Sequence, residues 1–588
     1  MNGKTVPAEK FGDVRMFKTC EQCGCCSSAC PITGVDGFNI RRILRHVELD
    51  LVEEIAHTPF PWACTTCGRC EGVCPNGITI LDIIRPLRSM SPGEFVPDGA
   101  PCIRACPGNI DIPGYVRLIA QGKPREACER ILEQVPFPGI LGRVCTHPCE
   151  EKCRRNEVNA PISICALKRF AADKTEDIFE ETLRVEADTG RKTAVIGAGP
   201  AGLTAAFYLR KKGHAVTIFE KKAKPGGMMR YGIPYYRLPE DVLDKEINRL
   251  LSAGIELRTN KRFGEDFHLT QLQAEGFESV FIAMGLPQSR KIELEGVQLQ
   301  GVSWGVEFLT EVAEKKPIEM KEKVLVVGGG NVAVDVALTA LRIGAKEVTM
   351  ACLESRQEMP ANPWEVAMAL EEGVKLMPSR GPTRIIGENG SVAGVELVRC
   401  TAVFDDGGNF CPTFDDKTET VGTDQVILAV GQMTDLSCFD GEQACSFEKD
   451  LIAVNPETQE TDMPGVFAGG DVANGPGTII EAIAAGKRAA DAIDRFLGGE
   501  GIIEDSGRRK PEGETIGLDL QNYDGKREKG FADLGRVAFP TVPVSERFHN
   551  FCEVDRCFSD EDAIREAKRC LQCDLELILG RGGKLDSA

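Results

Sequence analysis

The stretch TAVIGAGPAGLTAAFYLRKKGHAVTIFE, residues 193–220, decides the fold of the largest part of the chain. An apolar run leads into a glycine turn, a helical segment follows, and a second apolar run ends in an acid. Gly197 permits the tight turn, Gly199 lets the backbone approach a pyrophosphate, and Gly202 lets helix and strand pack closely. The pyrophosphate is expected at the helix N-terminus, where free N–H groups favour anions. Glu220 is then positioned to accept hydrogen bonds from ribose hydroxyls, so the stretch predicts a dinucleotide-binding βαβ unit.

A second unit with the same order of elements lies at residues 322–354, EKVLVVGGGNVAVDVALTALRIGAKEVTMACLE. An alanine takes the third place of its glycine turn, and the unit also ends in an acid. We expect it to bind a nicotinamide dinucleotide on the N-terminus of its helix. The residues assigned to this site are Gly328, Gly330, Asn331, Ala333 and Glu354.

The stretch MPGVFAGGDVANGPGTIIEAIAAGKRAADAI, residues 463–493, looks like the closing motif of an FAD-binding domain. In such a motif Asp471 binds the flavin ribityl chain, and a helix from about Thr478 points its N-terminus at the isoalloxazine. Two FAD halves would then enclose the nicotinamide unit, with crossover strands that end at Gly285 and Gln432. This order predicts an α/β protein with two Rossmann-like domains. The FAD site is assigned to Gly197, Gly199, Gly202, Glu220, Gly227, Gly285, Gly470, Asp471 and Thr478.

Cysteine is concentrated at the two ends of the chain. Of the 25 cysteines, sixteen lie from Cys20 to Cys165 and four from Cys552 to Cys573. The first residues lack the apolar core of a signal peptide, and no uncharged run is long enough to span a membrane. We therefore expect a cytoplasmic protein, in which cysteines are metal ligands or catalytic thiols more often than disulfides.

Two runs of the form C-x2-C-x2-C-x3-C-P are the most specific motif in the sequence. They are the ligand pattern of a module with two 4Fe–4S clusters, in which the fourth cysteine of each run reaches the other cube. A zinc site would need C-x2-C pairs or added histidines, and none of the six histidines is suitably spaced. One cluster is assigned to Cys20, Cys23, Cys26 and Cys74, and the second to Cys64, Cys67, Cys70 and Cys30. Cys25 breaks the pattern and is expected to be packed.

Residues 1–95 resemble the helical ferredoxin-like domain found in the HdrC-type component of heterodisulfide reductase. The likeness is carried by WACTTCGRCEGVCPNGITILDIIRPLR and by the helical spacing of FNIRRILRHVELDLVEEIAH between the two runs. The next segment, with APCIRACPGNIDIPGYVRLIAQGK and GILGRVCTHPCEEKCRRNEVNAPISICALKRFAAD, resembles the N-terminal domain of the glutamate synthase small subunit. The same domain occurs in the large subunit of NADH-dependent ferredoxin:NADP oxidoreductase and in dihydropyrimidine dehydrogenase. The resemblance implies two further 4Fe–4S clusters in a helical domain.

Those relatives begin the domain with an arginine-cysteine-x-x-cysteine element, which is missing ahead of Cys102. The C-terminal EAKRCLQCD supplies the same context, so we expect the tail to fold back and complete the site. The family's last ligand is a Gln or Glu at the position of Lys168, whose ammonium cannot ligate iron. Cys165, one helical turn earlier, is the candidate in its place, with a packed apolar role as its alternative. Carried over residue by residue, cluster three takes Cys102, Cys153, Cys570 and Cys573, and cluster four takes Cys106, Cys145, Cys149 and Cys165.

The resemblance also bears on the choice of cofactor and acceptor. NADPH-using relatives carry Tyr-Arg-Arg where this chain has Cys352, Leu353 and Glu354. A glutamate would repel a 2′-phosphate and accept from a free 2′-hydroxyl, which favours NADH, although Arg356 is near enough to leave NADP(H) open. The segment KKAKPGGMMRYGIPYYRLP resembles the flavin-contacting segment of the same family. Since the flavin domain has no C-x2-C or C-x4-C pair, the clusters are the expected electron acceptors.

Composition excludes other classes of function and sets the number of domains. A net charge of −19 opposes binding to a nucleic-acid backbone, and 6% aromatic residues leave little for base stacking. The 588 residues suggest about four domains. The division we predict is a ferredoxin-like domain at 1–95, a glutamate-synthase-type iron–sulfur domain at 96–185, FAD halves at 186–315 and 441–498, an NAD(P) domain at 316–440, and a linker with the returning tail at 499–588.

These features predict an electron-transfer flavoprotein of an anaerobe. NAD(H) exchanges a hydride with FAD, which exchanges single electrons with four 4Fe–4S clusters, and no acid–base catalyst is assigned because hydride transfer depends on positioning. The N-terminal module is the expected exit to ferredoxin or to a partner subunit such as a 2-oxoacid oxidoreductase, an aryl-CoA reductase or a heterodisulfide-reductase-like protein; electron bifurcation is left open. One alternative is a glutamate synthase small subunit that delivers NADPH electrons to an amidotransferase. Another is a structural iron–sulfur scaffold with vestigial nucleotide folds.

Overall fold

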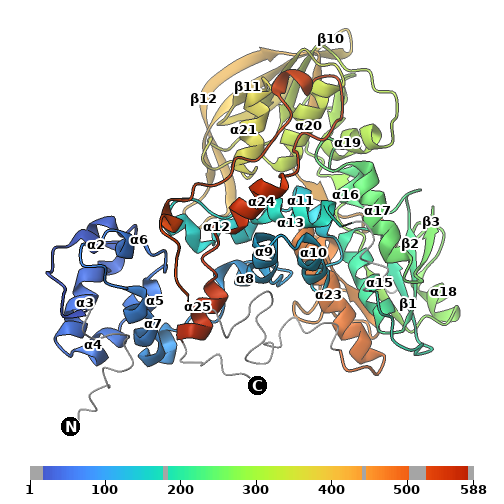
Figure 1. Cartoon of the computed structure of the whole chain (residues 1–588). Coiled ribbons are helices and arrows are strands. Elements are labelled where there is room, and N and C mark those ends of the chain that lie inside the picture. Colours follow the sequence, from blue (N-terminus) through green and yellow to red (C-terminus); the bar gives the residue numbers. More distant parts are fainter. Residues whose placement is uncertain (1–16, 176–182, 440–444, 502–524, 581–588) are drawn as a thin grey trace.

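The computed structural model describes residues 17–175, 183–439, 445–501 and 525–580. Helical regions occupy one end and the middle of the molecule, and two α/β units lie on the other side of the middle region (Figure 1). The C-terminal segment, in red, runs from the upper α/β unit across the middle region to the N-terminal helices. Most of the predicted linker, from Leu497 to Gly530, lies outside the described residues, as does the predicted start of the second FAD half at residue 441.

The N-terminal region consists of short helices around an apolar core that includes Ile43 and Ile83. The segment predicted to be helical between the cysteine runs forms two helices, because the chain turns at Asp50, which has a φ of 58°. Gly24 and Gly68 follow the second cysteine of each run in left-handed conformations and start equivalent helices. The helices are α2 (Cys25–Ala29), α3 (Ile40–Glu48), α4 (Val52–Ala56), α5 (Phe60–Ala63), α6 (Arg69–Gly72) and α7 (Leu81–Met90).

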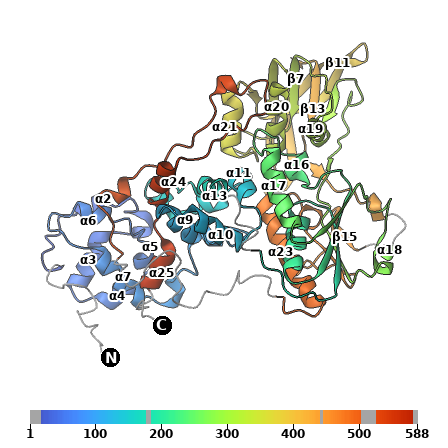
Figure 2. The same ribbon diagram turned by 45° about the vertical axis from the view of Figure 1, so that its right-hand side comes forward.

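The middle region combines helices from two distant parts of the sequence. Tyr115, Ile131 and Leu167 share one core with Ala563 and Ala567 of the C-terminal segment. Figures 1 and 2 both show α24 beside α9 and α13, and α25 beside the N-terminal helix α7. The helices are α8 (Pro101–Arg104), α9 (Ile112–Ala120), α10 (Pro124–Leu132), α11 (Pro138–Val144), α12 (Pro148–Glu151), α13 (Ile164–Asp173), α24 (Asp560–Ala567) and α25 (Cys573–Gly580).

The first α/β unit is built on a parallel sheet with the order β17-β4-β1-β2-β3. The central strand β1 is apolar and buried after its first residue, and the helices α15 and α23 pack against each other beside the sheet. The strands are β1 (Lys192–Ile196), β2 (Ala215–Glu220), β3 (Glu256–Thr259), β4 (Ser279–Ile282) and β17 (Val466–Ala468). The helices are α15 (Pro200–Lys211), α16 (Met228–Tyr231), α17 (Glu240–Leu251), α18 (Leu269–Ala274), α22 (Asp471–Asn474) and α23 (Ile479–Phe496).

The second α/β unit has a parallel sheet with the order β6-β13-β7-β8-β9. It takes in residues ahead of the predicted domain start at 316, because β6 pairs in parallel with β13. The strands are β6 (Val302–Trp304), β7 (Lys323–Val327), β8 (Glu347–Ala351), β9 (Lys375–Met377) and β13 (Gln425–Leu428), and the helices are α19 (Gly305–Ala313), α20 (Asn331–Arg342) and α21 (Pro363–Glu371).

Smaller sheets complete the described residues. An antiparallel sheet of β10 (Arg380–Glu388), β11 (Ser391–Phe404) and β12 (Phe410–Gly422) extends the second unit. The antiparallel pair β5 (Gln288–Ser289) and β14 (Gln432–Met433) joins the two units where the chain crosses between them, and β15 (Phe447–Glu448) pairs with β16 (Leu451–Ile452). The predicted fold class, two Rossmann-like α/β units preceded by helical regions, is confirmed. None of the described helices is both long enough and apolar enough to cross a membrane.

Candidate cofactor sites

A cavity of about 390 Å³ lies at the carboxyl ends of the first sheet, where α/β proteins bind nucleotides. Eight of the nine residues predicted for FAD line it: Gly197, Gly199, Glu220, Gly227, Gly285, Gly470, Asp471 and Thr478. The ninth, Gly202, lies beneath the turn. A Cβ built on Gly202 would lie 2.0 Å from the carbonyl oxygen of Gly197, so α15 reaches the turn only because this position has no side chain.

The turn itself is shaped to receive a diphosphate. Gly197 has a φ of 105°, and a Cβ there would lie 2.5 Å from the carbonyl oxygen of Ala283. Gly227 packs on the same turn, because a Cβ built on Gly227 would lie 2.7 Å from the Cα of Gly199. These two close approaches leave the backbone N–H groups at the start of α15 directed at the cavity, which suits the pyrophosphate of FAD.

A buried carboxyl group, Glu220, and a half-buried one, Asp471, face the same cavity. Glu220 accepts hydrogen bonds from the backbone N–H groups of Ala198 and Lys222, both at 2.8 Å, which holds its side chain at the end of β2. Burial raises the pKa of Glu220, and it raises the pKa of Asp471 to about 7. Thr478 caps α23, as predicted for the helix that should point at the flavin ring, so the first turn of α23 faces the cavity.

Several residues of the cavity were not predicted from the sequence. They come from the end of β2, from the loop after β3, from α19 and from the segment after β14. Only the lysines directly after Glu220 had a readable signal, since they adjoin the acid that ends the strand. The others reach the cavity through the tertiary fold alone. They include Lys221, Lys261, Arg262, Glu307, Thr310, Glu311, Asp435 and Cys438.

The second glycine turn repeats the first. Gly328 has a φ of 148°, and a Cβ there would lie 2.3 Å from the carbonyl oxygen of Ala429. Gly330 has no neighbour within 4 Å of a built Cβ, so a ligand can approach the backbone closely. Ala333 is fully buried beneath the turn. The carboxylate of Glu354 lies beside this turn, with one oxygen 2.6 Å from a Cβ built on Gly329, where the ribose of a dinucleotide is expected.

Asn331, the remaining residue predicted for this site, begins α20. Its side-chain oxygen accepts a hydrogen bond from the backbone N–H of Asn362 at 2.8 Å. This bond ties the glycine turn to the segment that precedes α21. The five residues predicted for the nicotinamide site therefore lie at or beneath one turn, and Glu354 and Asn331 flank it.

The first two cysteine sets meet in the N-terminal region. A small pocket is lined by all four thiols predicted for cluster one, Cys20, Cys23, Cys26 and Cys74. Cys25 lines it as well and is exposed, so the expectation of a packed residue is wrong. In the second set Cys64, Cys67 and Cys70 are buried, and burial together with Cys64, Cys67 and the half-buried Cys30 raises the pKa of Cys70.

The third set combines residues from both ends of the sequence. One small apolar pocket is lined by Cys102, Cys153, Cys570 and Cys573. Burial and then the neighbouring thiols Cys573, Cys570 and Cys153 raise the pKa of Cys102. The two tail cysteines therefore lie against the two from the middle region, as the sequence comparison led us to expect.

The fourth set surrounds a lysine. Lys168 is 3% exposed, and its ammonium has four neighbouring thiols, those of Cys145, Cys165, Cys149 and Cys106. Burial by itself lowers the pKa of Lys168, but these four thiols outweigh it and raise the pKa above its usual range.

One backbone feature recurs in the four sets. In each set the chain adopts a left-handed φ two residues after one cysteine, which is Cys20, Cys64, Cys145 or Cys570. The φ values are 54° at Gln22, 54° at Thr66, 44° at His147 and 53° at Gln572. In three of these turns the backbone N–H of that residue donates to the sulfur two positions earlier, at 3.4 Å. Left-handed non-glycine residues cost free energy and concentrate at functional sites, and N–H donors stabilise a thiolate. The donor sets thus suit iron–sulfur ligation, although no three His, Cys, Asp or Glu side chains of the described residues close around a single ion.

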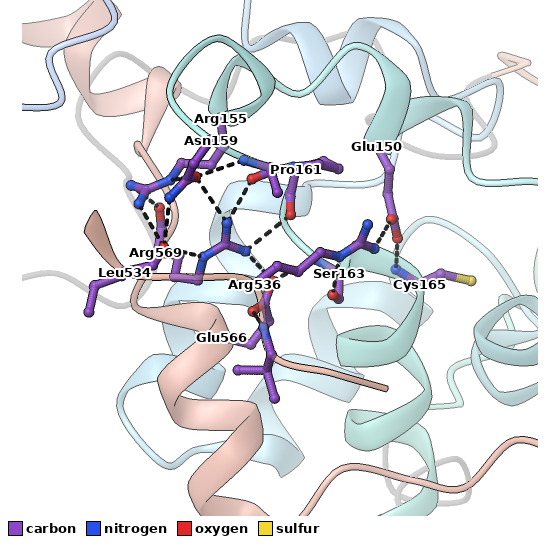
Figure 3. Close-up of polar contacts among 12 residues, drawn as sticks. Glu150, Arg155, Asn159, Pro161, Ser163, Cys165, Leu534, Arg536, Glu566 and Arg569 are labelled. Carbon is purple, nitrogen blue, oxygen red and sulfur yellow. Dashed lines mark hydrogen bonds and ion pairs between the residues drawn. The ribbon is translucent and has the colours of Figure 1, made fainter. Parts of the chain in front are cut away.

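The tail is fixed to the middle region by buried arginines (Figure 3). Arg155 is fully buried and donates to Asn159 at 3.0 Å and to the carbonyl oxygens of Arg569 and Leu534 at 3.1 and 3.2 Å. Arg569 is also fully buried and pairs with Glu566 at 2.6 Å. Since breaking such a buried network is costly, the tail cysteines are held in a defined position.

Comparison with known proteins agrees with this architecture. Family models match residues 191–486 (pyridine nucleotide-disulphide oxidoreductase), 98–178 (dihydropyrimidine dehydrogenase domain II, 4Fe-4S cluster) and 16–78 (4Fe-4S dicluster domain). The chain is 39% identical to the NADP(+)-dependent formate dehydrogenase subunit beta of Moorella thermoacetica, over 81% of this chain and 70% of the relative. It is 33% identical to the NADPH-Fe(3+) oxidoreductase subunit beta of Geobacter sulfurreducens, over 97% and 90%.

Two further similarities cover less of the chain. The NAD-dependent dihydropyrimidine dehydrogenase subunit PreT of Escherichia coli is 34% identical over 68% of this chain and 92% of its own length. Among solved structures, FprA from Mycobacterium tuberculosis aligns with a TM-score of 0.47 and 18% identity, over 52% of this chain and 85% of that chain.

The fold and the two nucleotide turns define an FAD-dependent NAD(P)H oxidoreductase with 4Fe–4S clusters, that is, an iron–sulfur flavoprotein. The chain belongs to the pyridine nucleotide-disulphide oxidoreductase family. The flavin unit nevertheless has no C-x2-C or C-x4-C pair, although the family is named for a disulphide. The relatives are dehydrogenase and oxidoreductase subunits, so the likeness to glutamate synthase is supported only at the level of an iron–sulfur flavoprotein.

Proposed function

We propose that this chain is the electron-transfer subunit of a larger complex, in which electrons pass between NADH, FAD and four 4Fe–4S clusters arranged in sequence. The observation that carries the proposal is the continuous succession of cysteine sets from the flavin cavity to the N-terminal end of the molecule. Each step of that succession rests on packing contacts. A carrier with one two-electron cofactor and several one-electron cofactors converts hydride chemistry into single-electron delivery.

The first step joins the flavin to cluster four. Thr478 and Ile479, at the start of α23, line the flavin cavity. The next residue, Ile480, packs against Gly108, because a Cβ built on Gly108 would lie 2.8 Å from the Ile480 side chain. Gly108 is two residues from Cys106, a proposed ligand of cluster four, so this cluster is the nearest acceptor for the flavin.

The next steps lead through cluster three to cluster two. The thiol of Cys149, assigned to cluster four, is among the neighbours that raise the pKa of Cys102, assigned to cluster three, and α8 and α12 pack together. On its other side, cluster three adjoins the N-terminal region. Cys67 of cluster two shares a small apolar cluster with Leu571, and Cys573 packs at its edge. The tail therefore belongs to the electron path as well as to the fold.

The path ends at cluster one, where the partner is expected. The crossed ligands Cys30 and Cys74 connect clusters two and one, and Cys23 at the far end is exposed. This end lies away from the flavin unit in both Figure 1 and Figure 2. The first two relatives bear the names of beta subunits, which supports a hetero-oligomer in which another subunit or a ferredoxin exchanges electrons with cluster one.

NADH is the proposed nucleotide, on the strength of Glu354 beside the second glycine turn. A carboxylate there accepts from a free 2′-hydroxyl and repels a 2′-phosphate. The names of the relatives divide between the two nucleotides, NADP(H) for two and NAD for PreT. A reducing, cytoplasmic setting fits a chain in which all 25 cysteines are unpaired.

The test is anaerobic purification of the intact protein with its partners, followed by iron and flavin counts and stepwise reduction with NADH watched by EPR. Four cubes predict about sixteen irons beside one flavin per chain. NADH should bleach the flavin and then give the signals of reduced clusters. A count of about eight irons, or clusters that NADH cannot reduce while dithionite can, would refute the proposal.

A further inference from the structure

The ammonium of Lys168 is buried without a carboxylate partner. Its side chain projects from α13 into the fourth cysteine set, and no described residue forms an ion pair with it. A buried cation without a partner is unfavourable, because it loses its hydration and gains nothing in exchange. The other buried cations of the described residues either pair with a carboxylate, as Arg342 does with Glu372 at 2.7 Å, or donate to carbonyl oxygens, as Arg155 does. The exception therefore calls for a source of negative charge beside Lys168.

The buried carboxylate of this region does not supply it. Glu150 is 4% exposed and has both oxygens engaged, as Figure 3 shows. One oxygen accepts from the backbone N–H of Cys165 at 2.9 Å, and the other accepts from the guanidinium of Arg536 at 2.6 Å. Arg536 donates in addition to the hydroxyl of Ser163 at 2.8 Å. Glu150 and Arg536 thus balance each other, and Lys168 faces the sulfur atoms alone.

Cys165 lies on the same face of α13, three residues before Lys168. Its thiol is buried and has the carbonyl oxygen of Leu141 at 3.1 Å and that of Cys145 at 3.9 Å. The sulfur therefore lies at the segment that ends in Cys145, among the other three thiols of the set. A cube bound by four thiolates carries net negative charge, and that charge grows on reduction.

We infer that Cys165 is the fourth ligand of cluster four and that the ammonium of Lys168 is the counter-charge of this cluster, which raises its reduction potential. The inference rests on the proposed function and specifies one site of it. In the step concerned, one electron leaves the reduced flavin and is accepted by the cube, and no bond is made or broken. A cation beside the acceptor stabilises the extra electron, so Lys168 favours transfer from the flavin into the chain of clusters. Lys168 acts through the cluster and is a positioning residue.

The charge is tested with Lys168→Gln and Lys168→Arg in the holoprotein, by redox titration followed by EPR. Lys168→Gln should lower the reduction potential of cluster four. The equilibrium constant for its reduction should fall at least tenfold, which corresponds to 59 mV for one electron. Lys168→Arg keeps the charge and should stay within about threefold, or roughly 30 mV by the same conversion. Lys174→Gln is the matched control, since Lys174 ends the same helix, is exposed and pairs with Asp560. Equal potentials in Lys168→Gln and wild type would overturn the inference.

The ligand is tested with Cys165→Ala, against Cys128→Ala as a buried cysteine outside the four sets. Cys165→Ala should lose the signal of cluster four, and Cys128→Ala should keep all signals. A Cys165→Ala protein that keeps cluster four would overturn the assignment. A Lys168→Gln protein that lacks cluster four would also overturn it, because the lysine would then be the ligand. Bleaching of the flavin by NADH and the signals of the other clusters are read from the same samples. If wild type shows neither flavin bleaching nor the signals of the other clusters, the proposed function is refuted. If wild type shows both, but cluster four is unchanged in the Lys168→Gln and Cys165→Ala variants, only this inference is refuted.

Discussion

The third glycine of the first turn and the second glycine of the second turn have different roles. Gly202 has no room for a Cβ, because the carbonyl oxygen of Gly197 occupies that space, whereas Gly330 faces open space. The first glycine is therefore required by packing, and the second by the approach of a ligand.

Gly202→Ala should prevent tight packing of α15 on the turn and give protein with less than about a tenth of the normal flavin. Gly330→Ala has a φ that alanine tolerates and should retain full flavin, while its KM for NADH rises several-fold because the added methyl meets the pyrophosphate. Flavin content by absorbance and steady-state kinetics measure the two effects. Full flavin in Gly202→Ala would contradict this account of the turn.

Glu354 carries the predicted preference for NADH. Replacing it with arginine removes the repulsion of a 2′-phosphate and adds a donor to it, so the ratio of kcat/KM for NADPH to that for NADH should rise at least tenfold. Glu354→Gln is the matched variant and should give a smaller rise, since it removes repulsion only. A wild type that already prefers NADPH would show that the carboxylate does not select the nucleotide.

At the scale of residues, the sequence predicted the site residues that belong to short motifs. Within each glycine turn and each cysteine run the residues lie together because short spacings constrain them directly, whereas the tail cysteines were placed only by the resemblance to a known domain. Arg262 and Asp435 were missed, because they reach the flavin cavity through loops whose positions depend on the whole domain. Cys25 was misjudged because spacing says nothing about which side of a loop faces the solvent.

At the scale of elements, one buried carboxyl group forms hydrogen bonds across the joint between the iron–sulfur and flavin units. Glu246 of α17 accepts hydrogen bonds from the backbone N–H groups of Gly139 and Ile140, at 2.7 and 2.9 Å, and so caps the N-terminus of α11 from another domain. Burial raises the pKa of Glu246 to about 7. No local pattern around residue 139 would have predicted this cap, since the acceptor is more than one hundred residues away.

This pKa gives the joint a pH dependence with a definite sign. Between pH 4.5 and about 7 the unfolded chain has lost the proton of Glu246 while the folded protein keeps it. The free energy of unfolding should therefore fall as pH rises through this window, by on the order of 3 kcal/mol, and level off above pH 7. Thermal unfolding of wild type and Glu246→Gln across pH 5 to 8 measures the difference. Parallel profiles would exclude a role of Glu246 in the pH dependence.

Elements were predicted less well than motifs. The closing helix α23 begins where its cap predicts, because Thr478 and Glu481 form the capping box locally. The segment between the cysteine runs is helical as predicted, but apolar spacing did not show that a left-handed turn at Asp50 divides it into α3 and α4. The start of the second sheet at β6 was missed for a related reason, because a strand of three residues owes its existence to its partner β13.

At the scale of the whole molecule, the C-terminal segment links the N-terminal region to the rest of the chain. Glu576 of α25 pairs with Arg85 at 2.9 Å, with Arg88 at 3.1 Å and with Arg527 at 3.3 Å, and it is nearly fully buried. These contacts hold the second cysteine set against the third, at the position where the proposed electron path leaves the middle region. The tail could be expected from its cysteines, whereas the arginines that hold it are dispersed in the sequence and carried no motif.

The central claim is that electrons from the flavin reach the N-terminal clusters only through cluster three. The most direct test is stopped-flow reduction of a Cys573→Ala protein by NADH at high dilution, with rapid-freeze EPR. The account predicts that flavin and cluster four are reduced as in wild type, while clusters one and two stay oxidised toward NADH and still accept electrons from dithionite. Reduction of clusters one and two at the wild-type rate would contradict it.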